Sequence, residues 1–339
     1  MDPLTQGVVG TAASQLVSKR TEKIAAAVIG FASGMAADLD VLITSSSDPL
    51  LFLEYHRHFT HALVFIPIGA LLCTLAFRAV FRAWFKRNKL SFARTYLYSF
   101  AGYATHALLD ACTTYGTQLF WPFSDMRVAW NNVSVIDPLF TLPLLILTAF
   151  ATFKRSHRMA LLAAVYAFSY LAFGLVQNSR AEAVAEELAI SRGHTPVNLG
   201  LKPSFANLIV WKSVYEYQGY YYVDAIRVLG KTNIYQGTAV EKLDVNKHFS
   251  WLDDRAQQSL DIERFRWFSN QHLALDPESP LRIIDVRYSL IPNQVTGMWG
   301  ITLDPSKASQ EHVEWTTNRP KGKKAMEKTA ELWQMVLGN

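Results

Sequence analysis

The sequence is poor in cysteine and in charge, and its first residues carry no basic run. Cys73 and Cys112 are the only cysteines in 339 residues, which excludes a disulfide framework and leaves the compartment undetermined by cysteine usage. Residues 1–3 lack the basic segment of a cleaved signal peptide, so we expect the first internal apolar segment to direct membrane insertion. Half of the residues are hydrophobic and 18% are charged, where a typical soluble domain has about 25% charged residues.

Apolar and charged residues are unevenly distributed along the chain. Residues 24–177 hold nearly all of the long uncharged runs, while residues 178–339 resemble an ordinary globular sequence. Residues 1–177 carry 14 Lys and Arg against 9 Asp and Glu, and residues 178–339 carry 19 of each, so the whole net charge of +5 belongs to the apolar part. This pattern favours loop charges that set membrane topology and argues against a nucleic-acid surface. We expect a membrane-embedded helical domain at residues 1–177 and an extramembrane domain at residues 178–339.

The apolar part contains segments long enough to span a bilayer. A spanning helix needs about 20 predominantly apolar residues. Residues 4–18 are too short to span and are expected to form a half-inserted or surface helix. The predicted fold class is an all-α transmembrane bundle of about five spans, followed by an α+β extramembrane domain. The predicted spans are residues 24–43, 59–77, 95–112, 133–153 and 159–177.

The second part of the chain has the signals of a mixed domain. We expect the last spanning helix to continue out of the membrane as far as residue 192. Residues 208–217 and 220–229 are rich in β-branched and aromatic residues and flank Gln218-Gly219, which predicts a hairpin. Further strands are expected at residues 281–290 and 297–303, and a closing helix at residues 324–337.

His106 and Asp110 are the first candidates for a functional site. Their spacing places both on one face of a helix in an otherwise apolar run, where ionisable groups are costly and commonly mark a site. Asp38 and Asp40 close an earlier apolar run. His56, His58 and His61 open the next one.

Imidazole and carboxylate ligands together suit Zn²⁺, Mn²⁺ or Fe²⁺. The seven candidates exceed what one tetrahedral ion needs, so a two-metal site that activates water and clamps a phosphoryl oxygen stays open. Taken singly, His56 and His58 also fit interfacial loop residues, and Asp38 fits the polar end of a helix.

Two further residues are candidates for the catalytic apparatus beside His56. Arg57 lies between two candidate ligands and would either grip an anionic group of the substrate or anchor the chain at headgroup level. Asp137 lies inside a predicted span, just before Pro138, so we expect it to face the bundle interior. There it would orient a ligand histidine or bind metal itself.

The ordered motifs resemble those of the YdjM-type family of bacterial inner-membrane metal-dependent hydrolases. Residues 178–339, with Trp211 and the stretch 284–288, resemble the long subgroup of that family. Many relatives have histidine where Gln6 stands, proline where Ala37 stands, and glycine where His58 stands, which ranks His58 below His56 and His61. The matching motifs are residues 1–7 (MDPLTQG), 37–40 (ADLD), 55–61 (YHRHFTH), 106–110 (HALLD), 116–122 (GTQLFWP) and 136–139 (IDPL).

The resemblance implies an inner-membrane location and metal-dependent hydrolysis. A distant kinship of these motifs with zinc phospholipase C and related zinc nucleases suggests phosphoester substrates. We therefore predict a membrane-bound hydrolase that acts on a lipid or lipid-linked molecule, with zinc as the first choice of metal. The expected metal ligands are Asp38, Asp40, His61, His106 and Asp110, with His56 as a further ligand or proton shuttle.

Two alternatives stay open at this point. A metal-ion binding or transport protein would use the same cluster, although a transport site is expected near the membrane midplane and these residues lie toward segment ends. A structural protein whose β domain binds a partner is the other alternative. The sequence does not define the oligomeric state.

The distribution of Lys and Arg predicts a topology that reporter fusions can test. Short loops rich in Lys and Arg stay in the cytoplasm, and residues 19–23, 78–94 and 154–158 are the rich ones. The N-terminus is then inside, and the metal-site residues and residues 178–339 are outside. A fusion after residue 88 should report the cytoplasm and one after residue 200 the outside. The same side for both would contradict the orientation and the outer-face site together.

Overall fold

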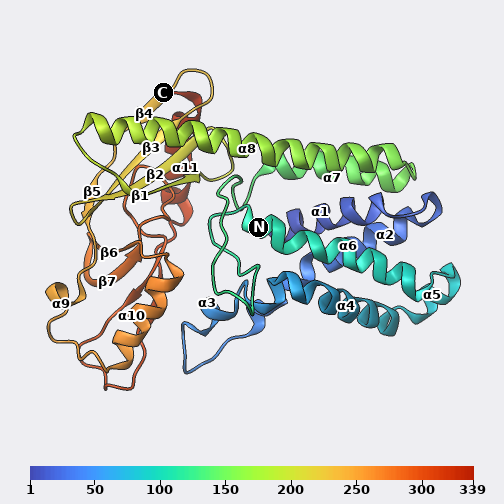
Figure 1. Cartoon of the computed structure of the whole chain (residues 1–339), viewed down its shortest axis with the longest axis horizontal. Helices are drawn as coiled ribbons and strands as arrows, with labels where there is room; N and C mark the ends of the chain where they lie inside the picture. The colour runs from blue at the N-terminus through green and yellow to red at the C-terminus, as the bar shows by residue number, and fades with distance from the viewer. The chain divides into compact units, whose positions relative to one another are not determined.

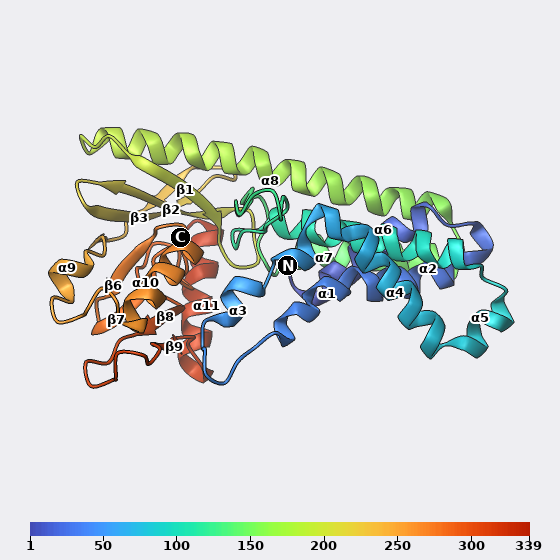
Figure 2. The ribbon, with the colours of Figure 1, turned by 60° about the horizontal axis from the view of Figure 1, so that its bottom comes forward.

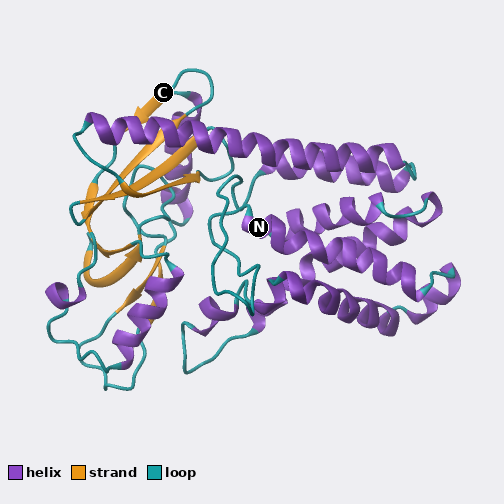
Figure 3. Ribbon diagram, viewed as in Figure 1, coloured by secondary structure: helices purple, strands orange, loops and turns teal.

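The computed structural model describes residues 1–339, with the side chains of all of them except residues 87 and 88 (Figure 1). The chain forms two compact units. The first comprises residues 1–43, 55–175 and 205–207, and the second comprises residues 44–54, 176–204 and 208–339. The first unit is built of helices, and the strands that the structure describes belong to the second (Figure 3).

Helices of the first unit begin at recognisable sequence signals. Proline occupies the first turn of α1, α4 and α7, where its missing N–H would have had no helical partner. The Asp2 carboxylate caps α1 by accepting from the Thr5 N–H at 3.0 Å. The helices are α1 (Pro3–Leu16), α2 (Lys23–Met35), α4 (Ile66–Val80), α5 (Arg82–Asn88), α6 (Phe92–Ala111), α7 (Pro138–Phe153) and the first part of α8 (His157–Ser191).

Glycines let three helices of this unit approach backbone to backbone. A Cβ added to Gly10 of α1 would lie 2.5 Å from the carbonyl oxygen of Gly30 in α2, and one added to Gly102 of α6 would lie 2.6 Å from the same oxygen. Small residues at such contacts permit close helix packing. Figures 1 and 2 show α1 beside α2 and α6, and most of its side chains are buried. Of the half-inserted or surface helix expected at residues 4–18, the surface alternative is therefore wrong.

Fewer helices are long and apolar enough to span a membrane than the sequence predicts. Among the residues that the structure describes, three helical stretches are long and apolar enough to cross a membrane: Arg20–Leu42, Leu63–Val80 and His157–Ser191. Helix α7 is apolar but shorter, and α6 carries buried polar side chains along its length. The fold class is thus membrane helices with an N-terminal helical region, followed by a β-sheet domain. The count of about five spans is not confirmed.

The second unit contains two antiparallel sheets. One has the order β1-β2-β3-β4, with β5 also paired to β3, and the other has the order β6-β7-β8-β9. Its short helices are α9 (Val245–His248) and α10 (Gln257–Phe268), and α11 (Gly322–Leu337) closes the chain. The strands are β1 (Val197–Pro203), β2 (Val210–Tyr217), β3 (Tyr220–Arg227), β4 (Asn233–Tyr235), β5 (Ala239–Glu241), β6 (Leu273–Asp276), β7 (Ser279–Asp285), β8 (Trp299–Thr302) and β9 (Glu314–Thr317).

The predicted elements of this unit are confirmed. Strands β2 and β3 pair through a two-residue turn in which Gln218 and Gly219 have φ of 49° and 79°, the backbone that a tight right-twisted hairpin needs. Strand β8 and helix α11 lie where the sequence predicts them, and α8 continues to Ser191, while the strand predicted at residues 281–290 is found as β7 and ends at Asp285. Buried Val214, Val223 and Ile284 belong to one hydrophobic cluster of this unit.

Candidate metal centre

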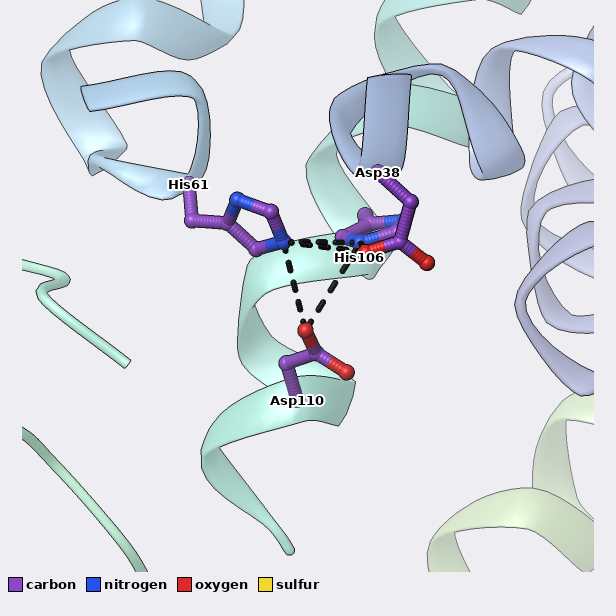
Figure 4. A group of neighbouring side chains, drawn as sticks. All are labelled: Asp38, His61, His106 and Asp110. Atoms are coloured by element: carbon purple, nitrogen blue, oxygen red, sulfur yellow. Dashed lines mark hydrogen bonds and ion pairs between the residues drawn. The ribbon is translucent and has the colours of Figure 1, made fainter. Parts of the chain in front are cut away.

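Three chain segments bring four ionisable side chains together in the first unit. Asp38 lies in the short 3₁₀ helix η2 (Ala36–Leu42) that follows α2, and His61 ends η3 (Phe59–His61). His106 and Asp110 lie one turn apart near the end of α6. Figure 4 shows the four side chains pointing toward one another. His61, His106 and Asp110 are completely buried, and the side chain of Asp38 is 20% exposed.

The spacing of the four ligand atoms fits a small tetrahedral cation. The two imidazole Nε2 atoms are 3.0 Å apart. Asp38 Oδ1 lies 3.5 Å from His61 Nε2 and 3.3 Å from His106 Nε2, while Asp110 Oδ2 lies 3.2 Å and 3.7 Å from the same two atoms. Zinc bonds of about 2.0–2.1 Å to nitrogen and oxygen give a tetrahedron with edges of about 3.3 Å. The observed separations bracket that value.

The hydrogen bonds of both imidazoles direct lone pairs into this centre. His106 Nδ1 lies 2.6 Å from the Gly34 carbonyl oxygen, which can only accept, so Nδ1 carries the hydrogen. His61 Nδ1 lies 3.2 Å from Asp40 Oδ2 and 3.0 Å from Thr60 Oγ1, whose own hydrogen is donated to Asp40. In neutral rings each Nε2 then carries a lone pair, and the two Nε2 atoms face each other. This is the tautomer that outer partners impose on metal-ligating histidines.

Two buried oxygens at the centre support the same conclusion. Gln6 Nε2 donates to Asp110 Oδ1 at 2.8 Å, and Gln6 Oε1 is buried without a hydrogen bond from any described residue. Asp110 Oδ2 is buried too, and it lies 2.9 Å from Arg57 Nε and 3.2 Å from His61 Nε2. The amino group of Met1 also contacts Asp110 Oδ1. Buried polar atoms are normally satisfied, so Gln6 Oε1 fits a further partner such as a cation, and Asp110 Oδ2 faces the same point as the imidazole nitrogens.

Asp40 and His56 form a second group with Asp38. The ligand atoms of these three residues lie within 4.8 Å of one another. His56 Nδ1 is 2.9 Å from Asp40 Oδ1, while Asp40 Oδ2 accepts the Arg57 N–H at 3.0 Å and the Thr60 hydroxyl at 2.8 Å. The Asp40 carboxylate is therefore occupied by donors that fix His56 and His61. Asp38 belongs to both groups, which makes it the residue placed to bridge two ions.

Arg57 and Asp137 have partners of different kinds. Arg57 is 4% exposed, and its guanidinium contacts Asp110 Oδ2 at 2.9 Å and Thr113 Oγ1 at 2.9 Å, so it holds the end of α6. Asp137 caps α7 by accepting from Leu139 and Phe140, and it also accepts from the Tyr170 hydroxyl at 2.9 Å. Among the described residues, no member of the cluster is a partner of Asp137. His58 packs edge-on against Tyr55 and tilted against Trp121, outside the group of four.

Several supporting residues escaped the sequence argument. Thr60 lies within the HRHFTH motif, and only its position between two histidines could have indicated its role. The ring of Tyr115 lies 5.8 Å from that of His56, and the guanidinium carbons of Arg57 and Arg127 lie 4.9 Å and 5.8 Å from the ring centre. Tyr115 directly precedes Gly116, the first residue of the motif at residues 116–122, and only this position could have indicated its role.

Comparisons with known proteins agree with the helical unit. A family model described as "YdjM inner membrane protein" matches residues 1–181. The chain is 33% identical over 110 residues to "Inner membrane protein YbcI" of Escherichia coli strain K12, which covers 31% of this chain and 60% of that protein. The chain thus spans less than two thirds of that relative's length. No solved structure matches the chain significantly.

Asp38 gives the cleanest test of metal binding, because its contacts are with the cluster histidines and it does not cap or pack a helix. We expect purified protein to bind at least one zinc ion and Asp38→Asn to lower the affinity by more than about 100-fold. Asp40→Asn should lower the zinc affinity by about 10–100-fold, the usual effect of removing a residue that orients a metal ligand. Affinity is measured by competition with a chelator, and His58→Ala is the matched control. Unchanged affinity in Asp38→Asn would remove that carboxylate from the site.

Proposed function

Because this chain belongs to the YdjM family of inner membrane proteins, we propose that it is a membrane-bound metal-dependent hydrolase. The observation that carries the proposal is the pair of imidazole Nε2 atoms, 3.0 Å apart in a buried centre that also holds two carboxylates. Two neutral imidazoles with their hydrogens on Nδ1 and two carboxylates offer four donor atoms to one point, which is the ligand set of a divalent cation. A divalent metal, zinc first and manganese or iron as alternatives, would supply Lewis acidity and activate water at neutral pH.

Each residue of the site has a distinct part in this proposal. Asp38, His61, His106 and Asp110 hold the metal, while Asp40 orients the rings of His56 and His61. His56 is the proton carrier, because its Nδ1 is fixed by Asp40 and its side chain is 19% exposed, so Nε2 can exchange a proton with water. Arg57 positions Asp110, and its guanidinium, which lies over the Tyr115 ring, is the cationic group that would favour an anionic substrate.

A lipid or lipid-linked phosphoester is the proposed substrate. The ligands lie at the ends of apolar stretches: Asp38 is near the end of Arg20–Leu42, and His61 lies two positions before the start of Leu63–Val80. Leu39, Val41 and Leu42, which surround the carboxylates in sequence, are 64%, 50% and 75% exposed. An apolar rim beside a polar centre suits a molecule with acyl chains and a charged headgroup. The five-span topology with residues 178–339 outside the inner membrane is part of the same proposal.

A hydrolysis screen tests the function. Metal-loaded protein in detergent should hydrolyse a phosphodiester or phospholipid substrate, lose activity on chelation and regain it on addition of zinc. His56→Gln should keep its metal and lose about 10²–10⁴-fold in kcat, the range for a general acid or base. His58→Gln is the control from the same motif and should stay active.

Two results would count against hydrolysis. Full activity in His56→Gln would remove the proton carrier from the mechanism. Stoichiometric metal without turnover of phosphodiester, phospholipid or acyl ester, together with metal uptake into proteoliposomes, would establish the transport alternative instead.

A further inference from the structure

The segment between the ligand-bearing elements is held by the C-terminal part of the chain. Residues 44–54 follow Asp40 closely and end two positions before His56, yet they pack with residues 176–339 in the second unit. Leu50 and Leu53 are 0% and 2% exposed. Phe52 packs edge-on against Trp315 with ring centres 5.2 Å apart. The segment is therefore docked on the second unit, and does not behave as a free loop.

One guanidinium binds two carboxylates of this segment, one in its interior and one at its end. Arg264, on α10, donates from Nη1 and Nη2 to the two oxygens of Asp48, at 3.0 Å and 2.8 Å. Its Nε donates to Glu54 Oε1 at 2.5 Å. Planar two-pronged pairing of this kind fixes geometry more strictly than a single ion pair. Burial raises the pKa of Asp48, but the hydrogen bonds from Arg264 outweigh it and hold that pKa below its ordinary value.

Arg264 is itself held on a rigid base. Its Nη1 also donates to Asp261 Oδ1 at 2.9 Å. Asp261 is completely buried and accepts the Val313 N–H at 3.1 Å and a hydrogen bond from His312 Nδ1 at 2.9 Å. The Asp261 carboxylate thus links α10 to His312 and Val313, the two residues directly before β9. Arg264 is the point at which this network reaches the segment between the metal-site motifs.

We propose that Arg264 is a positioning residue for the metal centre, acting through residues 44–54 to fix Asp38 and Asp40 relative to His56 and His61. The proposal rests on the proposed function in requiring that the cluster binds metal. Its physical basis is chain connection. Glu54 is two positions from His56 and Asp48 is eight positions from Asp40, and each residue spans at most about 3.6 Å, so the contacts of Arg264 restrain His56 closely and Asp40 less strictly. A free segment would leave that spacing to the helices and to the hydrogen bonds of Asp40 with His56, Arg57 and Thr60.

The expected consequence is a metal affinity that depends on a residue remote in sequence from every ligand. Arg264→Gln should weaken zinc binding by about 10–100-fold, the range for residues that orient ligands. It should also change the visible spectrum of the cobalt-loaded protein, which reports coordination geometry. Arg264→Lys should give an intermediate affinity, because an ammonium cannot pair with both oxygens of Asp48 and with Glu54 in the same way. The double variant Asp48→Asn with Arg264→Gln should lose less free energy of zinc binding than the sum of the losses in the two single variants.

Arg192→Gln is the matched control. Arg192 donates to both oxygens of Asp224, is 24% exposed against 21% for Arg264, and has no contact with residues 44–54 among the described residues. Full-length protein in detergent is compared for zinc affinity, cobalt spectrum and thermal stability. The proposal requires Arg192→Gln to match the unmodified protein in affinity and spectrum, whatever its effect on melting.

The possible failures are distinguishable. If Arg264→Gln has the zinc affinity and the cobalt spectrum of the unmodified protein, while Asp38→Asn still loses metal, the positioning role is overturned and the proposed function stays intact. Equal losses in Arg264→Gln and Arg192→Gln would also overturn it, because general damage to the second unit would explain both. Unmodified protein that binds no zinc or cobalt would remove the proposed function and the positioning role with it.

Discussion

The close approach of two imidazoles in a buried, carboxylate-lined centre is the constraint on which the rest of the site depends. The Gly34 carbonyl and the Asp40 carboxylate accept from the far ring nitrogens of His106 and His61, so in neutral rings the near nitrogens present lone pairs to each other. Arg57 and the Met1 amino group offset part of the charge of Asp110, and a cation between the rings would be bound by these lone pairs and the carboxylates. Burial and tautomer together, more than the mere presence of histidine and aspartate, distinguish this cluster from an ordinary polar contact.

The helix packing explains how the centre is assembled. A Cβ on Gly34 would lie 2.7 Å from the carbonyl oxygen of Gln6, so α1 and α2 meet only because glycine is there. That contact lets Gln6 reach Asp110 and leaves the Gly34 carbonyl free for His106. Asp40, Thr60 and Arg57 then hold the ligands from outside. The site is thus supported by short-range packing within the helical unit and, in our proposal, by the anchored segment 44–54.

The sequence alone predicts the convergence of ligands better than it predicts their support. Positions at the ends of apolar runs and the four-residue spacing of His106 and Asp110 suffice to predict that these groups meet. The burial of α1 is not predictable in this way, because the sequence does not show which helices its glycines contact. Asp137 shows the opposite failure: a charge before proline in an apolar run fits a site residue, but here it fits a helix cap with a tyrosine partner equally well.

X-ray absorption at the zinc edge of the metal-loaded protein tests the central claim most directly. The account predicts two imidazole nitrogens and oxygen ligands in a four-coordinate shell at about 2.0–2.1 Å, with the imidazole signal lost in a His106→Ala variant. A shell of six oxygens without imidazole scattering, or an unchanged spectrum in the variant, would contradict it, because the two facing histidines would then not bind the metal.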